Sequence, residues 1–253
     1  MIDGAPVVMI ATTSSKNAKT GAGLVQTWIL NDNGKSPLDN NREGSDYSIC
    51  GNCQHRGTPD ATRSTGQATG RTCYVALYQG VSTVAAKHHR NGYPTATPEQ
   101  TAAMLSGKGL RAGSYGDPAA VPQAVWDRLF GLCAYHTAYT HQRDIMPTDP
   151  RMMVSADTRT EAQQAHQQGY RTFRVIPVTD WTNEGRAALM PSEILCPASA
   201  ESTSKDVTCD KCKLCNGSDS PKAKSIAIVA HGTSRKVFKT NESNTAPTMK
   251  DAA

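Results

Sequence analysis

The sequence predicts an α/β protein in which a parallel sheet alternates with helices and forms a complete or partial (β/α) barrel with a Cys-rich metal-binding loop. From residue 110 onward, short apolar runs rich in β-forming residues alternate with amphipathic stretches. Polar or metal-competent residues follow most of these runs, as they do at the catalytic face of a barrel. Four cysteines between residues 196 and 215 indicate the metal-binding loop.

Composition limits the classes of function. The 253 residues are enough for one barrel-sized domain or two small domains. Only 38% are hydrophobic and 6% aromatic, so we expect a small core for this length. The net charge is +5, but the Lys and Arg residues are scattered and form no dense stripe. Nucleic-acid binding is therefore not indicated beyond this mild basic charge.

The cysteines indicate a reducing compartment. The N-terminal residues show no basic segment followed by a long apolar run, so we expect no signal peptide. No stretch approaches about 18 consecutive apolar residues, so we expect no membrane span. In a cytoplasmic protein, eight cysteines are expected to be thiolate ligands, and a disulfide framework is not expected.

Three regions are expected along the chain. Residues 1–46 hold two strands, 7–12 and 25–30, and a polar loop over 31–46. Residues 47–232 form the barrel-like domain, with the metal loop at 196–217. Residues 233–253 are polar and are expected to be a flexible tail.

Within the domain, the apolar pattern and the capping residues predict the elements in order. Helix starts are marked by Thr97-Pro98 with Gln100, and by Thr158 with Glu161. The expected strands are 73–77, 110–115, 134–140, 152–156, 171–176, 193–195 and 225–230. The expected helices are 79–90, 121–132, 158–169, 180–189 and one from Thr97 that ends at Gly107.

The loop at 196–217 carries the most specific motif. Three of its four cysteines are spaced Cys-x2-Cys-x2-Cys, and the fourth is followed by proline, as in ferredoxin [4Fe–4S] sites. Structural zinc, which four cysteines also bind, is the second interpretation. Unliganded thiols on a loop are the third. The four cysteines are Cys196, Cys209, Cys212 and Cys215.

A second, weaker set consists of Cys50, Cys53 and Cys73. Three protein ligands with one open position are typical of a catalytic metal or a substrate-binding cluster. The fourth ligand would be His55, Cys133, a water or a substrate. The alternative is that Cys73 and Cys133 are small buried apolar residues, as free cysteines often are.

Two residues that follow expected strands are candidates for catalysis. Asp117 follows strand 110–115, and His141 follows strand 134–140, as Asp157 and His231 follow later strands. For Asp117 the alternative is a turn role before Pro118. For His141 the alternative is a hydrogen-bonded core histidine.

With these features the chain resembles radical S-adenosylmethionine enzymes. The resemblance lies in cysteines before an early strand, the Gly116-Asp117-Pro118 turn, and a strand that ends at Asp157. It implies that Cys50, Cys53 and Cys73 hold a [4Fe–4S] cluster, and that Gly113, Gly116 and Asp117 bind S-adenosylmethionine. The family motif is Cys-x3-Cys-x2-Cys, from which this chain departs.

From about Cys50 to Gly232 the chain is also similar to a family of uncharacterised, cysteine-rich phage and prophage proteins. The shared blocks are Cys-x2-Cys…Cys-Tyr-Val, Gly-Ser-Tyr-Gly-Asp-Pro, Tyr-Thr-His-Gln, Tyr-Arg-Thr-Phe-Arg-Val and Cys-Pro…Cys-x2-Cys-x2-Cys. This resemblance implies a location in the host-cell cytoplasm or the virion and no particular activity.

The sequence thus leaves two functions open. The first is a metalloprotein, with iron–sulfur favoured, that acts as a radical S-adenosylmethionine-like enzyme on an unknown substrate. The second is a zinc-stabilised, non-catalytic phage protein that acts as a binding or virion component. In the first case the 196–215 cysteines are structural or relay electrons to the open site.

Overall fold

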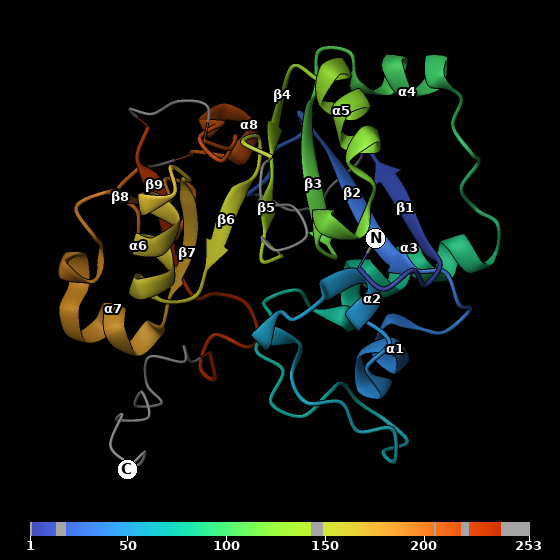
Figure 1. The fold of residues 1–253 in the computed structure, drawn as a ribbon, viewed down its shortest axis with the longest axis horizontal. Helices are drawn as coiled ribbons and strands as arrows, with labels where there is room; N and C mark the ends of the chain where they lie inside the picture. Colours follow the sequence, from blue (N-terminus) through green and yellow to red (C-terminus); the bar gives the residue numbers. More distant parts are fainter. Residues whose placement is uncertain (1, 14–18, 143–148, 205, 219–222, 239–253) are drawn as a thin grey trace, which may run out of the picture.

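The structure is a computed structural model that describes residues 2–13, 19–142, 149–204, 206–218 and 223–238. It is a mixed α/β fold with two sheets side by side (Figure 1). The first sheet has the order β1-β2-β3-β4, and only β1 and β2 are antiparallel. Its strands are β1 (Val7–Thr12), β2 (Leu24–Asn31), β3 (Gly109–Tyr115) and β4 (Tyr135–Thr137).

The second sheet is entirely parallel and has the order β5-β6-β7-β9-β8. Its strands are β5 (Tyr139–Thr140), β6 (Met153–Ala156), β7 (Thr172–Ile176), β8 (Glu193–Leu195) and β9 (Ser225–Val229). Because β9 lies between β7 and β8, the strand order departs from the sequential order of a (β/α) barrel.

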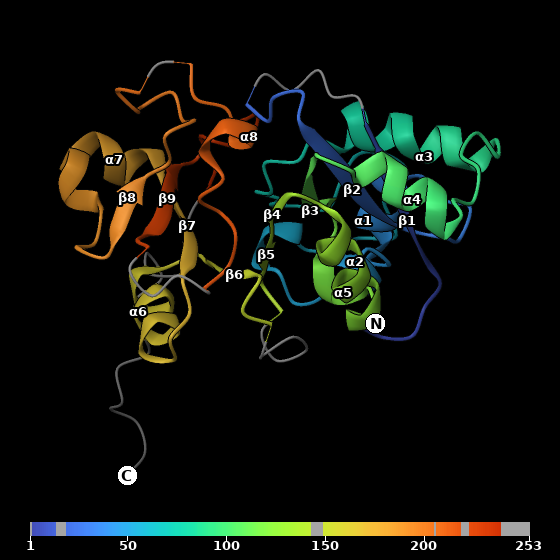
Figure 2. The same cartoon turned by 90° about the horizontal axis from the view of Figure 1, so that it is seen from above.

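Helices connect most of the parallel strands, as expected for βαβ units. α5 joins β3 to β4, α6 joins β6 to β7, and α7 joins β7 to β8. α6 and α7 lie at the part of the second sheet that is farther from the first sheet. α8 lies between the two sheets at one end (Figures 1 and 2). The helices are α1 (Pro37–Glu43), α2 (Tyr47–Cys50), α3 (Ser82–His89), α4 (Pro98–Leu105), α5 (Gln123–Leu132), α6 (Arg159–Gln167), α7 (Val178–Glu184) and α8 (Cys209–Cys212).

The two sheets meet at Ala138, the single residue between β4 and β5. Its amide donates a hydrogen bond of 3.1 Å to the carbonyl of Cys215. Its carbonyl accepts a hydrogen bond of 3.0 Å from the amide of Met153. The expected strand 134–140 is therefore interrupted, because the cysteine loop takes the place of a strand neighbour at this point.

The architecture is open. In the part of the chain that the structure describes, the two sheets end at β1 and β8, and these two strands do not pair with each other. The complete barrel that the sequence allowed is thus not formed there. The parallel strands β3, β5, β6, β7, β8 and β9 still direct their carboxyl ends toward a shared region between the sheets (Figure 1).

The larger core lies on the first sheet. Its fully buried side chains include Trp126 of α5, Ile29 of β2 and Leu110 of β3. The second sheet has two small clusters, one around Ala162 of α6 and one around Ile176 of β7. Small residues dominate these two clusters, which agrees with the low aromatic content of the sequence.

The predicted loop 31–46 is wrong, because α1 lies within it. Ser36 caps this helix, its hydroxyl accepting a hydrogen bond from the amide of Asp39, and Pro37 occupies the first turn. Gly44 ends the helix with a φ of 91°, a left-handed conformation that favours glycine. The serine, proline and glycine were the usual signals for a short helix.

The predicted strand 73–77 is also wrong. Cys73 lies in an irregular segment, where its amide donates to the carbonyl of His55. Leu77 begins a π-helical turn, Leu77–Val81, that continues into α3. The helical segment therefore begins before the expected helix 79–90, and α3 itself begins at Ser82. Leu77 is fully buried on the first sheet, so its apolar character reflects packing of a helical turn.

The structure confirms several elements that were predicted from neighbouring residues in the sequence. Both capping boxes form: Thr97 with Gln100 at α4 and Thr158 with Glu161 at α6. The expected strand 193–195 is β8. The expected helix 180–189 is α7 followed by a 3-10 turn, Gly185–Ala188.

The structure describes only the first residues of the predicted C-terminal tail, and it can be searched for membrane-spanning helices. Residues 239–253 of the predicted tail lie outside the described residues, and Phe238 is buried. No helix among the described residues has the length and apolar character needed to cross a membrane.

A buried ion pair fixes the edge of the second sheet. Arg174 of β7 donates to both carboxylate oxygens of Glu193 at the start of β8, at 2.7 and 2.6 Å. Arg174 also donates to the carbonyl of Ala188, and Glu193 accepts from the amide of Met190. These contacts reach across β9 and hold β8 at the edge of the sheet.

We expect Glu193→Gln to lower the free energy of unfolding by about 3 kcal/mol in urea titrations, because it leaves the Arg174 guanidinium buried without a counter-charge. The control is Glu184→Gln, which breaks the exposed Arg159–Glu184 pair and is expected to cost less than about 1 kcal/mol. Equal losses for the two variants would contradict this role of Glu193.

Candidate functional site

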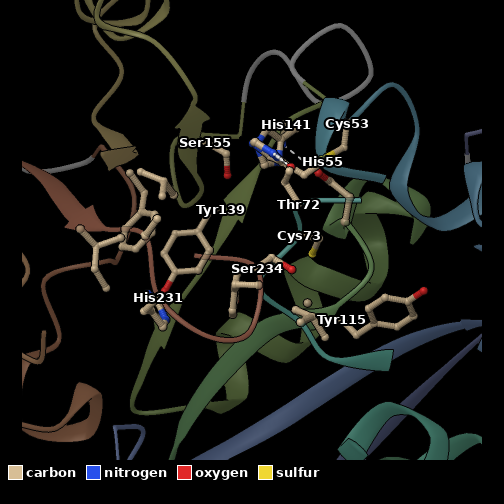
Figure 3. A pocket seen from close by; sticks show the side chains of 18 of the residues that line it. Cys53, His55, Thr72, Cys73, Tyr115, Tyr139, His141, Ser155, His231 and Ser234 are labelled. Atoms are coloured by element: carbon tan, nitrogen blue, oxygen red, sulfur yellow. Dashed lines mark hydrogen bonds between the residues drawn. The ribbon is translucent and has the colours of Figure 1, made fainter. Parts of the chain in front are cut away.

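A cavity of about 230 Å³ opens at the carboxyl ends of the parallel strands. Its volume is below the range of about 300–1,000 Å³ usual for drug-sized ligands. Figure 3 shows side chains from both sheets around it. Six cysteines from the two predicted sets line this cavity: Cys50, Cys53, Cys73, Cys196, Cys209 and Cys215.

The first cysteine set is gathered by the backbone of His55. Cys50 ends α2, and Cys53 precedes the 3-10 turn Gln54–Arg56. The carbonyl of His55 accepts the amides of Thr72 and Cys73, which brings residue 73 beside this turn. Burial raises the pKa of the Cys50 thiol well above its usual value, and nearby Asp46, Cys53 and Cys73 add to the effect. Burial raises the pKa of Cys73 as well.

Cys133 does not belong to this set. Its thiol lies 3.7 Å from the carbonyl oxygen of Phe130 at the end of α5, and it packs against the core of the first sheet. It is also absent from the residues that line the cavity. The structure therefore gives Cys133 the role of a small apolar residue, one of the two alternatives left open by the sequence.

The second cysteine set docks against the N-terminal part of the chain. Cys196 follows β8, and its amide donates to the carbonyl of Ala227 in β9. The amide of Cys209, the first residue of α8, donates to the carbonyl of Lys19 at 2.8 Å. The carboxylate of Asp210 accepts the amide of Gly23 at 3.1 Å. These bonds attach α8 to the segment that leads into β2.

Arg171 fixes the end of the cysteine loop. This buried guanidinium donates to the carbonyls of Leu214, Gly217 and Lys224, at 2.8, 2.7 and 2.8 Å. It also donates to the side-chain oxygen of Asn216 at 3.1 Å. Because these partners flank Cys215, Arg171 determines where the Cys215 backbone lies.

The thiols of the second set are partly buried, and those of Cys196, Cys209 and Cys215 are affected by their neighbours. Burial, with contributions from Cys209 and Cys212, raises the pKa of Cys196 to about 11. Burial raises the pKa of Cys215 further, with contributions from Cys196 and Cys209. Burial raises the pKa of Cys209 too, but Arg111 and Lys19 oppose this increase. A positive charge in the form of a metal would favour the thiolates.

The tightest ligand group is not made of cysteines. Among the residues that the structure describes, the one group of three or more His, Cys, Asp or Glu ligand atoms that all lie within 4.8 Å of one another is His55, His141 and Asp157. Neither cysteine set is gathered as closely, so neither forms a site for a single ion as it stands.

His55, His141 and Asp157 form what we call the His–His–Asp cluster. Nε2 of His55 lies 2.8 Å from Oδ1 of Asp157, and Nε2 of His141 lies 3.3 Å from the same oxygen. His55 comes from the 3-10 turn, whereas His141 and Asp157 follow β5 and β6. Figure 3 shows the two imidazoles beside each other at the cavity.

The pKa values of His141 and Asp157 are shifted in opposite directions by their contact. Burial alone would lower the pKa of His141, but Cys53 and Asp157 outweigh it and raise the pKa well above its usual value. Burial alone would raise the pKa of Asp157, but hydrogen bonds with His141 and His55 hold it well below its usual range. Cys53 acts on the pKa of His141, and His141 contacts Asp157, so a thiol, an imidazole and a carboxylate meet here as they do in activated thiol nucleophiles.

Asp117 holds two strand ends together. Its carboxylate accepts hydrogen bonds from the Thr140 hydroxyl at 2.6 Å and from the His141 amide at 2.8 Å. It also accepts the amide of Ala119. Burial raises its pKa, and these hydrogen bonds oppose the increase. Asp117 therefore positions His141, which agrees with the turn role that the sequence left open.

The glycines before Asp117 are required by the backbone. Gly113 has a φ of 67° and Gly116 a φ of 79°. A Cβ on Gly113 would lie 2.6 Å from the carbonyl oxygen of Gly116, and a Cβ on Gly116 would lie 2.7 Å from Ile29. Both glycines line the cavity, so their backbone is available to a bound molecule.

Sequence reasoning did not assign three residues of this site. His55 was considered only as a fourth ligand of the first cysteine set, and Asp157 only as a residue after a strand. Arg111 of β3 lines the cavity and donates to the hydroxyl of Tyr74 at 3.0 Å. The position of Asp157 at a strand end was the signal that could have joined it to His141.

We expect Arg171→Met to loosen the cysteine loop. Hydrogen bonds to a charged group contribute about 1.5–3 kcal/mol each, and about 1.4 kcal/mol is tenfold in an equilibrium constant. Alkylation of Cys215 in reduced, metal-free protein, followed by mass spectrometry, should therefore accelerate at least about tenfold. Cys133 is the internal control and should react at an unchanged rate. An unchanged rate at Cys215 would exclude this role of Arg171.

Comparisons with known proteins assign the chain to no family. No family model, curated protein or solved structure matches the chain. The chemistry of the site is therefore inferred from the cavity, the two cysteine sets and the His–His–Asp cluster.

Proposed function

We propose that the protein is an iron–sulfur protein of the radical S-adenosylmethionine-like type, with an open cluster on Cys50, Cys53 and Cys73. A second [4Fe–4S] cluster on Cys196, Cys209, Cys212 and Cys215 relays electrons or stabilises the fold. The substrate binds at the mouth of the cavity between the two sheets, because a volume of about 230 Å³ does not enclose both a substrate and S-adenosylmethionine.

One observation carries this proposal: members of both cysteine sets line the same cavity at the carboxyl ends of parallel strands. The two sets come from parts of the chain more than a hundred residues apart. Scattered structural thiols have no reason to converge in this way. Enzymes with parallel α/β sheets place their chemistry at this end of the strands.

The described sulfurs do not form a ready-made site for a single zinc ion. With Zn–S bonds of about 2.3 Å, a tetrahedral site brings its sulfurs to about 3.8 Å from one another. Among the described residues, no three sulfurs lie within 4.8 Å of one another. A four-iron cluster binds each thiolate through a different iron, so its ligands stand farther apart than those of one ion.

Positive charge near the second set also supports a cluster. Arg111 and Lys19 both oppose the rise in the pKa of Cys209, and Lys19 does the same for Cys196. A [4Fe–4S] cluster with four thiolate ligands carries net negative charge. Cations beside it stabilise the bound state and influence its reduction potential.

S-adenosylmethionine would bind where the first set meets the end of β3. Gly113 and Gly116 both line the cavity, so their backbone can contact a bound ligand. Asp117 keeps the β3 and β5 ends together beside this backbone. When both groups are bound, an open cluster supplies the electron that cleaves S-adenosylmethionine.

Iron and sulfide analysis of anaerobically reconstituted protein tests the clusters. We expect a brown protein with about eight irons and eight sulfides per chain. Cys212→Ser and Cys53→Ser should each remove about half, because each breaks one set. Cys133→Ser is the matched control and should retain all the iron.

A colourless protein that retains no more iron than a variant lacking both sets would overturn the proposal. Zinc in place of iron, with no binding of S-adenosylmethionine, would establish the zinc-stabilised, non-catalytic alternative.

The S-adenosylmethionine part has its own test. Electron paramagnetic resonance of the dithionite-reduced protein should change when S-adenosylmethionine is added, because the molecule binds the open iron. The change should be absent in Cys53→Ser and present in Cys212→Ser. An unchanged wild-type spectrum with intact clusters would exclude the radical-type activity.

A further inference from the structure

We propose that the His–His–Asp cluster is a mononuclear binding site for a divalent transition-metal ion of the Fe(II)/Zn(II) class, separate from both cysteine sets. Two histidines and one carboxylate are a recurring ligand set for such ions. In both non-haem iron and catalytic zinc sites this set leaves coordination positions open for water or substrate.

The distances match those of a metal site. Bonds of about 2.1 Å place neighbouring ligand atoms about 3.0 Å apart in octahedral geometry and about 3.4 Å apart in tetrahedral geometry. The two Nε2 atoms lie 2.8 and 3.3 Å from Oδ1 of Asp157. All three ligand atoms lie within 4.8 Å of one another. One ion can therefore reach all three with small side-chain movements.

The outer hydrogen bonds are also those of a metal site. Metal-binding histidines use their second ring nitrogen to contact a polar group, which fixes the tautomer and the ring orientation. Nδ1 of His55 lies 2.8 Å from the hydroxyl of Thr72, and this contact fixes the orientation of the His55 ring. Gln54 donates to Oδ2 of Asp157 at 2.6 Å, which leaves Oδ1 directed toward the two imidazoles.

The cluster is buried on one side and accessible on the other. The side chains of His55 and Asp157 are 8% and 7% exposed, whereas that of His141 is 28% exposed. The ring of Phe238 stacks on His55 with centroids 4.7 Å apart and covers it. All three ligands line the cavity, so an ion can enter from it and its open positions face the proposed substrate.

Cobalt(II) is the probe, because it replaces both Fe(II) and Zn(II) and absorbs visible light. Full-length protein with both iron–sulfur clusters reconstituted should bind one additional Co(II) per chain by metal analysis, and the added absorbance should lack a thiolate-to-cobalt charge-transfer band. His141→Ala and Asp157→Asn should remove this cobalt. Thr72→Val, which keeps the side-chain shape, should weaken binding by about 10–100-fold.

The control is His231→Ala, which alters a histidine of the same cavity outside the cluster and should bind cobalt normally. Cys209→Ser should also leave this cobalt in place, and Asp157→Asn should keep the iron and sulfide of the clusters. These results separate the ion site from the iron–sulfur proposal.

Two results would overturn the site. One is cobalt binding that persists in Asp157→Asn and His141→Ala but disappears in the cysteine variants. The other is the absence of cobalt binding to the wild-type protein; alkylation of Cys53 that depends on His141 would then make the cluster a thiol-activating relay.

Discussion

The hydrogen bond from the Ala138 amide to the Cys215 carbonyl is the contact on which the site depends. It interrupts one continuous strand, separates the two sheets and places the cysteine loop between them. Arg171 holds the same loop from the second sheet through three backbone carbonyls. Together with the hydrogen bonds of Cys209 and Asp210 to the segment before β2, these contacts fix the loop relative to the first cysteine set. The cavity is therefore a consequence of how the loop is anchored between the two sheets.

The end of β3 and the ends of β5 and β6 form the second support. Asp117 ties the β3 end to Thr140 and His141, and His141 in turn faces Asp157 after β6. A chain of hydrogen bonds thus connects three strand ends with the turn that carries His55. Hydrogen bonds from surrounding groups orient metal ligands, and this chain orients His141 and Asp157. It also places the His–His–Asp cluster beside Cys53, so the two proposed metal sites share one wall of the cavity.

Local signals predicted the fold better than the site. The capping boxes at Thr97 and Thr158 depend on residues three positions apart, and both form as expected. The interruption at Ala138 depends on a carbonyl from residue 215, which no periodicity reveals. His55 and Asp157 are separated by 102 residues, so their contact follows only from the packing of strand ends. Cys73 was assigned to a strand because its neighbours are apolar, although they pack as an irregular segment and a helical turn.

The central claim is that one cavity collects metal at both cysteine sets and at the His–His–Asp cluster. Anomalous diffraction from crystals of anaerobically prepared protein, measured at the iron and zinc absorption edges, tests it most directly. We predict strong iron peaks beside Cys53 and beside Cys212, and a weaker single-ion peak between His55 and Asp157. The protein for this experiment is never exposed to chelator or oxygen. Anomalous maps in which all three places lack a peak would contradict the claim.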